Sequence, residues 1–383
     1  MFLQIHSLCS YHATLLNRDD AGLAKRIPFG NATRLRVSSQ CLKRHWRETL
    51  AGVLDLPGAV RTRHFFSREI LPRLTDERGV PMETAEELVR QLARAIIKTS
   101  DGTKEPIDES LQMKQPVLFG RPEADYLVAL LAECASQENA TAALSDRLKT
   151  DKANFKTMLR EAGHGDLYTG VEGALFGRFV TSDILARTDA SVHVAHAFSV
   201  HAQDNEVDYF TVVDDLNREE ETGAAHANDM DLGSGVYYGY VAVDIPQLIS
   251  NFTGCERTAW RAQPSGEARS VLSELVRVIA TTSPGAKLGA TAPYAYADFV
   301  LLEAGRQQPR SLANAYLQAV PPRGDVVQTA IDRLRDHLDG QERMYGATAE
   351  LRTLATTANW SGEPRPEPLA SATETALAHV FGE

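Results

Sequence analysis

Hydrophobic positions along the chain change their spacing several times, and each change predicts a different kind of element. Residues 2–9 are mostly apolar and suit a strand. Between about residues 60 and 160, apolar residues recur at helical spacing, as at Leu88, Leu92 and Ile96. Turn-rich stretches interrupt this region without forming long linkers. The pattern therefore predicts a helical insertion rather than a separate linker-bounded domain.

From residue 191 the hydrophobic pattern alternates with a period of two, which is typical of strands. Residues 191–201 form one predicted strand, and residues 236–245 form another. Residues 204–234 between them are polar and acidic, apart from an aromatic and β-branched run at residues 209–213. This order predicts an extended β-hairpin whose tip projects into solvent. Apolar residues on such a hairpin indicate a contact surface.

The last third of the chain predicts a strand–helix–strand unit. Apolar residues between 271 and 279 mark an amphipathic helix that ends at Ser283-Pro284-Gly285, and residues 296–302 suit a strand. Added to the first strand, this unit favours an α+β sheet of the RRM-like or ferredoxin-like type. The residues after about Thr353 are rich in Thr, Ala, Pro and Glu, and we expect them to be loosely held.

Composition describes an ordinary globular protein with an acidic balance. The chain has 383 residues, 43% hydrophobic and 24% charged, and a formal net charge of −11. Such a balance argues against indiscriminate coating of duplex DNA but permits a locally basic groove. The four cysteines have no metal-binding spacing, which predicts reduced thiols of a cytoplasmic protein. The sequence also predicts neither a signal peptide nor a membrane span.

One short segment runs against this acidic balance. Residues 17–50 contain eight Lys and Arg against three acidic residues, an excess of five positive charges. Residues 34–37 alternate, so a strand would place Arg34 and Arg36 on one face and Leu35 and Val37 on the other. A basic island on an acidic protein indicates an anionic partner, most often phosphate.

A helix is predicted to begin directly after this strand. Ser38 and Ser39 offer capping hydroxyls, and a helix N-terminus attracts anions. One stripe of this helix is polar and basic, and its members are Gln40, Lys43, Arg44 and Arg47. Together with the strand arginines, the stripe predicts a track for several phosphates. The alternative is a solvated basic helix beside a structural strand, with Trp46 in the core.

Two further patterns resemble ligand-binding motifs. His193, His196 and His201 alternate along a predicted strand, which turns His196 away from the other two and argues against a shared metal ion. The loop at residues 285–291 lacks the P-loop spacing and follows a helix, so it does not predict nucleotide hydrolysis. Its Gly285 and Lys287 nevertheless suit contact with a sugar-phosphate chain.

Acidic pairs at Asp19-Asp20 and Asp214-Asp215 are candidate Mg²⁺ ligands for phosphodiester cleavage. Neighbouring acids on a strand point to opposite faces, and no further ligands accompany them. A solvated face or local ion pairs to Arg18 explain them better. No Ser or Cys has a recognisable base, so the sequence predicts no catalytic site, metal or cofactor.

Five segments carry a collinear resemblance that spans nearly the whole chain: Asn17-Arg18-Asp19, residues 36–44 (Arg-Val-Ser-Ser-Gln-Cys-Leu-Lys-Arg), residues 213–216, residues 234–238 and Pro284-Gly285-Ala286-Lys287. In this order they resemble the CasC-type backbone subunits of the type I-E CRISPR Cascade complex. The segment at residues 36–44 together with the Pro-Gly-Ala-Lys segment is the most specific part of the match.

The resemblance implies a right-hand shape with an RRM-like (ferredoxin-like) palm, a helical finger insertion and an extended β-hairpin thumb. The expected boundaries are 1–58, 183–200 and 236–383 for the palm, 59–182 for the finger insertion and 201–235 for the thumb.

The resemblance also implies roles for individual residues. It places Arg18, Ser38, Gln40, Lys43, Arg44 and Lys287 on RNA phosphates and sugars. Joined to the basic track, the residues expected to bind the RNA backbone are Arg18, Arg34, Arg36, Ser38, Ser39, Gln40, Lys43, Arg44, Arg47, Arg178, Gly285 and Lys287. The residues expected to stack on or wedge between bases are Phe179, Tyr209, Phe210, Thr211 and Val213.

The function implied is that of a non-catalytic subunit that polymerises head to tail along crRNA and holds the guide for base pairing with target DNA in antiviral defence. The expected nucleic-acid partners are crRNA and, through the guide heteroduplex, target DNA. The expected protein partners are further copies of the chain and four other Cascade subunits: the large subunit, the small subunit, the crRNA 5′-end-binding subunit and the crRNA-processing endonuclease. No membrane partner is expected. One alternative is a metal-dependent RNA-cleaving CRISPR backbone subunit, and a weaker one is a protein-only scaffold.

Overall fold

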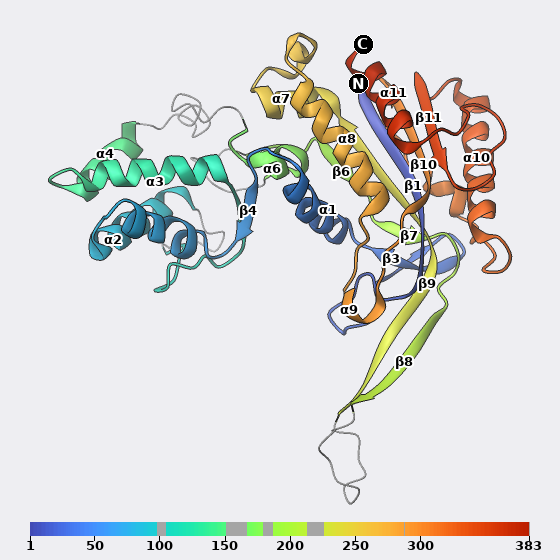
Figure 1. Ribbon diagram of the computed structural model, residues 1–383, viewed down its shortest axis with the longest axis horizontal. Helices are drawn as coiled ribbons and strands as arrows, with labels where there is room; N and C mark the ends of the chain where they lie inside the picture. Colours follow the sequence, from blue (N-terminus) through green and yellow to red (C-terminus); the bar gives the residue numbers. More distant parts are fainter. Residues whose placement is uncertain (98–104, 151–166, 179–186, 213–225, 287, 383) are drawn as a thin grey trace, which may run out of the picture. The chain divides into compact units, whose positions relative to one another are not determined.

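A computed structural model describes residues 1–97, 105–150, 167–178, 187–212, 226–286 and 288–382, and the structural statements below concern these residues (Figure 1). They form a mixed α+β fold with a large antiparallel sheet, so the predicted α+β class is confirmed. Among these residues, no helix combines the length and apolar character needed to cross a membrane.

The described elements, in chain order, are β1 (Phe2–Thr14), β2 (Arg26–Phe29), β3 (Ala32–Val37), α1 (Ser39–Val53), β4 (Ala59–Thr62), η1 (Phe65–Ile70), η2 (Arg73–Glu77), α2 (Met82–Ile96), β5 (Val117–Gly120), α3 (Arg121–Ala135), α4 (Ala140–Thr150), α6 (Gly170–Phe176), β6 (Val192–Val194), β7 (Ala197–Ser199), β8 (Asn205–Val212), β9 (His226–Asp244), α7 (Ile245–Thr253), η3 (Arg257–Ala262), α8 (Gly266–Thr281), α9 (Leu288–Thr291), β10 (Ala297–Gly305), η4 (Ala313–Tyr316), α10 (Val326–Tyr345), β11 (Leu351–Thr356) and α11 (Leu369–Phe381).

The chain divides into two compact units. Unit 1 comprises Met1–Val53, His193–Ile245 and Arg269–Glu383, and unit 2 comprises Leu54–Val192 and Pro246–Ala268. Unit 2 therefore contains the region expected as a helical insertion. It also contains Pro246–Ala268, a segment that the sequence interpretation had assigned to the palm.

The main sheet has the strand order β11-β10-β1-β9-β7-β3-β2, with β6 and β8 also paired to β9. Strand β1 lies between β9 and β10 and is antiparallel to both, with Ile5 opposite Val241 on one side and Leu302 on the other. β9 and β10 therefore run parallel to each other, and α8 belongs to the connection that crosses over β1. The predicted strand–helix–strand unit is confirmed, with its second strand beginning at Ala297.

Both faces of this sheet are covered within unit 1. Leu8, Tyr238 and Leu301 on one face pack with residues of η4 and α10, including Tyr316 and Leu334. Helices α1 and α8 lie on the other side of the sheet (Figure 1). Trp46 of α1 is buried there, so the interpretation of Trp46 as a core residue is confirmed.

The expectation of a loosely held C-terminal tail is wrong. Strand β11 pairs with β10 along its length, and Thr353 Oγ1 donates to the Ala372 carbonyl of α11 at 2.8 Å. Ala372, Ala376, Leu377 and Val380 of α11 are buried. The Ala- and Thr-rich composition that suggested disorder instead provides small side chains for close packing against the sheet.

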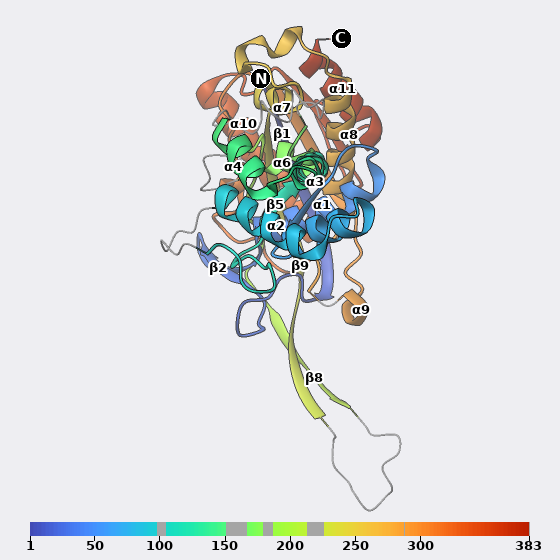
Figure 2. The same cartoon turned by 90° about the vertical axis from the view of Figure 1, so that its left-hand side faces the viewer.

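Strands β8 and β9 form a long hairpin that extends from the sheet. All eight residues of β8 pair with β9, from Asn205 opposite Gly233 to Val212 opposite His226. The hairpin extends away from the rest of unit 1 in both views (Figures 1 and 2). The extended hairpin is therefore confirmed. The predicted strand at residues 191–201, however, breaks into β6 and β7, because Ala195 and His196 leave the strand between them.

Unit 2 has a core of its own, formed mainly by η1, α2 and α3. Phe65 stacks on Phe119 with ring centroids 3.8 Å apart, and Leu88, Leu92 and Leu127 are buried around them. Helical spacing therefore predicted this core correctly. The two-stranded β4–β5 sheet was missed, since its four-residue strands are too short to show a period.

Candidate nucleic-acid interface

The basic segment forms a continuous structure in unit 1, because one loop links its two halves. The side-chain oxygen of Asn17 accepts from Ser38 N at 2.9 Å, and its carbonyl accepts from Lys25 N at 2.8 Å. The Lys25 carbonyl in turn accepts from Arg36 N at 2.8 Å. The loop at residues 17–25 therefore lies against the end of β3 and the start of α1.

Helix α1 begins as the sequence predicted. The Ser38 hydroxyl accepts from Cys41 N at 3.3 Å, which caps the helix. Ser38 and Ser39 are themselves buried, so their hydroxyls have a structural role. Gln40 and Arg44 are exposed and Lys43 and Arg47 are half-buried, whereas Leu42, Trp46 and Leu50 face the core. The predicted polar stripe is therefore accessible along the helix.

His196 marks the place where three cations converge. Its Nδ1 lies 3.2 Å from Ser39 N and 3.2 Å from Arg36 Nη1. Burial lowers the pKa of His196, and the positive charges of Arg36, Lys25 and Lys43 lower it further. A neutral imidazole thus accepts hydrogen bonds inside a positively charged environment. Such an environment at a helix N-terminus favours an anion.

A cleft of about 320 Å³ opens beside these cations, and it is lined by Asp19, Asp20, Leu23, Ala24, Lys25, Arg26 and Arg36. One of its two acids, Asp19, has local structural partners. Asp19 Oδ1 accepts from the backbone N–H groups of Ala21 and Leu23 at 2.9 and 3.0 Å. No group of three or more His, Cys, Asp or Glu in the described part of the chain is placed to hold a metal ion.

We call Arg18, Lys25, Arg36, Lys43, Arg44 and Arg47 the basic surface. Arg18 is exposed and bridges to Ala24 across the loop. Arg44 is exposed and forms an ion pair with Glu48 at 2.9 Å. An array of accessible cations along a strand, a loop and a helix suits a chain of phosphates.

Arg34 is not part of this surface, and its place in the expected RNA-binding set is corrected. The residue has 0% exposure. Its guanidinium donates to the carbonyls of Ser199 and Val200, at 3.3 and 2.5 Å, and to the carbonyl of Tyr316 at 2.8 Å. Residues from elsewhere in unit 1 therefore cover Arg34, whereas Arg36 on the same strand is only half-buried. Arg34 therefore holds the fold together.

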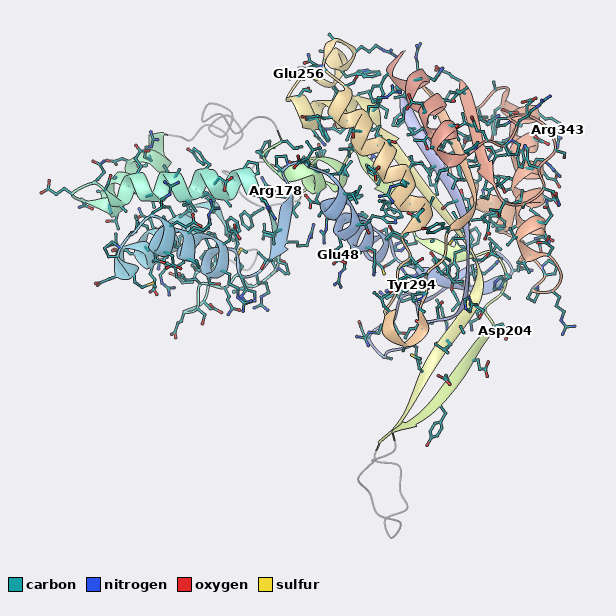
Figure 3. All side chains as sticks on the ribbon, in the orientation of Figure 1. Glu48, Arg178, Asp204, Glu256, Tyr294 and Arg343 are labelled. Carbon is teal, nitrogen blue, oxygen red and sulfur yellow. The ribbon has the colours of Figure 1, made fainter. Side chains whose placement is uncertain are left out.

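Arg178 requires the same correction. Arg178, which is labelled in Figure 3, is 2% exposed in unit 2, and its Nη1 donates to Glu123 Oε2 at 2.6 Å. Its guanidinium also lies 5.9 Å from the Tyr168 ring centre. Glu123 accepts from Gly120 N at 2.9 Å, so the pair joins the start of α3 to Arg178. This buried ion pair is structural.

The loop that carries Gly285 is tied to the basic segment. Ala286 N donates to the Leu15 carbonyl at 2.9 Å, two residues before Asn17. A Cβ on Gly285 would lie 2.4 Å from Leu288 Cδ2 and 2.9 Å from Pro293 Cγ. Glycine at this position is therefore explained by packing within the loop. Lys287 lies outside the described residues.

Of the residues expected to contact bases, Tyr209 lies on β8 with 67% exposure. Its neighbours Phe210 and Thr211 pair through their backbones with Asn228 and Ala227 of β9, and their side chains lie outside the description. Phe179 and Val213 also lie outside the described residues. An exposed tyrosine on a projecting strand fits a contact role.

The three histidines do not come together. His193 is exposed, His196 lies at α1, and His201 is buried with Nδ1 2.7 Å from the Ala202 carbonyl. Their rings have different surroundings, and they form no common cluster among the described residues. The histidines are separated because the strand breaks between β6 and β7, and not because side chains alternate along one regular strand.

A second charged cluster lies inside unit 1. Glu303 of β10 has 0% side-chain exposure and accepts from Arg310 Nη1 at 2.6 Å and from Arg352 Nε at 2.7 Å. His6 Nε2 lies 3.1 Å from the same carboxylate. Burial alone would raise the pKa of Glu303, but the hydrogen bonds from His6 and Arg310 hold it well below its ordinary value. Burial lowers the pKa of His6.

Comparison with known proteins assigns the chain to a family. A family model described as "CT1975-like protein" matches residues 3–380, and the chain belongs to this family. No curated protein matches it. One similar solved chain comes from a "CRISPR RNA-guided surveillance complex, pre-nicking", with 28% identity, a TM-score of 0.79 and 100% of both chains covered. A second, from a "CRISPR RNA-guided surveillance complex", has 21% identity, a TM-score of 0.60 and the same coverage, and shows shared fold.

Sequence reasoning missed three contributors to this interface. The sequence pattern counts Lys25 among the positive charges without predicting it as a site residue, and it indicates Asn17 only through the family resemblance. His196 was considered only as a metal ligand. Asn17 and Lys25 are close enough in sequence to Arg36 to have been included. Nothing in the sequence predicts that His196, more than 150 residues later, lies at the start of α1.

Proposed function

We propose that this chain is a crRNA-binding subunit of a Cascade-type CRISPR surveillance complex. Membership of the CT1975-like family and the similarity to a surveillance-complex chain over the full length support this role. The observation that carries the argument is the basic surface. It presents accessible cations from β3, α1 and the loop at residues 17–25 on a protein whose net charge is −11. Contacts of this kind bind a nucleic-acid backbone irrespective of sequence.

The finer role is that of a backbone subunit of the type I-E system, with copies arranged head to tail along the guide. The strand order β10-β1-β9-β7, with α1 and α8 in the connections, matches a split βαβ arrangement and supports an RRM-like palm. The β8–β9 hairpin is the proposed thumb, and unit 2 is the proposed finger region. The guide would then be read by base pairing with target DNA, as in other RNA-guided systems.

The chain is proposed to act without catalysing cleavage. Asp19 holds a turn, and Asp231 accepts from Arg26 Nη2 at 2.9 Å and from Ala24 N at 3.0 Å, so these acids stabilise the loop beside the basic surface. A purified assembly incubated with Mg²⁺ and labelled RNA should leave the RNA intact. Mg²⁺-dependent loss that Asp20→Ala abolishes would instead establish the cleaving alternative.

Co-expression with a CRISPR array and the partner subunits tests the assignment. The purified assembly should carry RNA of defined length. Less RNA should copurify with assemblies that carry the double variant Arg36→Ala/Lys43→Ala. The control is Arg277→Ala, which changes a surface arginine of α8 that is paired with Glu274, and it should copurify with as much RNA as the wild type. A wild-type chain that remains free of RNA and monomeric beside its partners would overturn the proposal.

A further inference from the structure

Two tyrosines stand out on the loop between α8 and β10. Tyr294 is 73% exposed and Tyr296 is 75% exposed. Tyr294, labelled in Figure 3, lies in the segment that follows α9. Burying an aromatic ring is among the larger favourable contributions to binding, so two uncovered rings beside each other in sequence indicate a contact surface.

Hydrogen bonds between Ser283 and Ala295 hold the two ends of this loop together, and side chains pack inside it. The Ser283 hydroxyl donates to the Ala295 carbonyl at 3.1 Å and accepts from Ala295 N at 2.9 Å. Pro293, directly before Tyr294, is buried, and both Pro293 and Leu288 lie close to Gly285. The Tyr296 carbonyl lies 3.5 Å from Cys9 Sγ of β1. The rings are therefore presented from an ordered support, which reduces the entropy lost on binding.

One backbone hydrogen bond joins the same loop to the chain just before the residues that hold the basic surface. Ala286 N donates to Leu15 O, and Asn17 two residues later holds the start of α1 through Ser38. All of these residues belong to unit 1. A ligand with both negative charge and flat apolar rings would match the two neighbouring features. Single-stranded nucleic acid has this chemistry, because its phosphates and its unstacked bases are both accessible.

We infer that Tyr294 and Tyr296 form a stacking surface for unpaired bases of a single-stranded nucleic acid whose phosphates lie on the basic surface. This inference rests on the proposed function and adds to it a site for bases outside the β8–β9 hairpin. Stacking on tyrosine tolerates any base, since every base has a π-face. The tyrosines thus add affinity without adding sequence preference.

The test measures binding of the purified full-length chain to an unstructured single-stranded RNA. The double variant Tyr294→Ala/Tyr296→Ala should weaken binding about 5- to 50-fold, while Tyr294→Phe/Tyr296→Phe should bind like the wild type because the rings remain. The salt dependence should keep its slope in both variants, since no phosphate contact is removed. Tyr345→Ala, which removes a tyrosine of 70% exposure at the end of α10, is the matched control and should have no effect.

An abasic oligomer with the same sugar-phosphate chain completes the test. The alanine variant and the wild type should bind it equally, because it offers no base to stack. Equal loss of affinity for both ligands, or an alanine variant that binds RNA normally, would overturn the stacking surface. If it binds RNA normally while losing contact with a partner subunit, the tyrosines form a protein interface instead. A wild-type chain that binds no RNA would overturn the proposed function as well.

Discussion

Unit 1 uses the same type of side chain in two opposite ways. Arg34, Arg310 and Arg352 have buried or largely buried guanidinium groups that donate to carbonyls or to Glu303. Arg36 and Arg44 lie at the surface, and Arg36 belongs to a group of cations that converge near His196. Only Leu35 separates Arg34 from Arg36. The comparison shows that accessibility, rather than local positive charge, separates structural arginines from candidate phosphate ligands.

The largest effect is expected from removing the charge of the buried cluster. Glu303→Gln leaves Arg310 and Arg352 without their shared carboxylate and should destabilise unit 1 by about 3–5 kcal/mol. Urea unfolding followed by circular dichroism measures the change. Glu274→Gln, which removes a partly exposed ion pair with Arg277, should change stability by less than about 1 kcal/mol. Equal effects of the two variants would show that the buried cluster is not structural.

A crossed pair of variants makes the comparison sharper. Arg34→Ala deprives three carbonyls of their donor and should cost about 2–4 kcal/mol of stability, with the RNA affinity of the folded protein unchanged. Arg36→Ala should leave stability within about 1 kcal/mol and weaken RNA binding about 5- to 10-fold. Parallel thermal melts and binding titrations report both properties. If the folded Arg34→Ala variant lost as much RNA affinity as Arg36→Ala, the distinction between a structural Arg34 and an RNA-binding Arg36 would be wrong.

These two arginines also show how much the sequence predicts. The period-two pattern correctly placed Arg34 and Arg36 on a strand, and helical spacing correctly placed an accessible stripe on α1. Whether a side chain of β3 is covered depends on distant residues such as Tyr316, which lies 282 residues beyond Arg34. Local pattern contains no information about such contacts. Composition misled in the same way at the C-terminus, where α11 packs through small side chains that resemble a loose tail.

Acid should weaken unit 1 in two stages. The pKa of His6 is lowered by burial, so the unfolded chain takes up a proton at this residue that the folded chain does not as pH falls below about 6.5. The pKa of Glu303 is also held below its ordinary value, so its contribution is present above about pH 4.3 and is lost as pH falls further. Unfolding free energies from pH 8 to pH 3, a range of about five units, should show both declines, each with a limiting slope of about 1.4 kcal/mol per pH unit.

The variant His6→Gln provides the control for this pH dependence. It should reduce the slope between about pH 6.5 and pH 5 relative to the wild type, because one titrating group is removed. Since the pKa of His196 and that of His337 are also lowered by burial, a residual slope should remain. An unchanged slope in His6→Gln would mean that the folded and unfolded states protonate His6 alike.

The smallest effect concerns the exposed pair on α1. Arg44 Nε lies 2.9 Å from Glu48 Oε1, with 69% and 56% of the two side chains exposed. Glu48→Gln should change stability by less than about 0.5 kcal/mol. It should also strengthen RNA binding by about twofold or less, because Arg44 loses a competing partner. Weaker RNA binding by Glu48→Gln would indicate that the carboxylate positions Arg44 for its ligand.

The central claim is that the basic surface grips a nucleic-acid backbone irrespective of sequence. The most direct measurement is the salt dependence of RNA affinity for the wild type, Arg36→Ala and Lys43→Ala, each with two unrelated single-stranded RNAs. The account predicts equal affinity for both RNAs and a log–log slope that each variant makes shallower by about one. Unchanged slopes in both variants, or a clear preference of the wild type for one RNA, would contradict it.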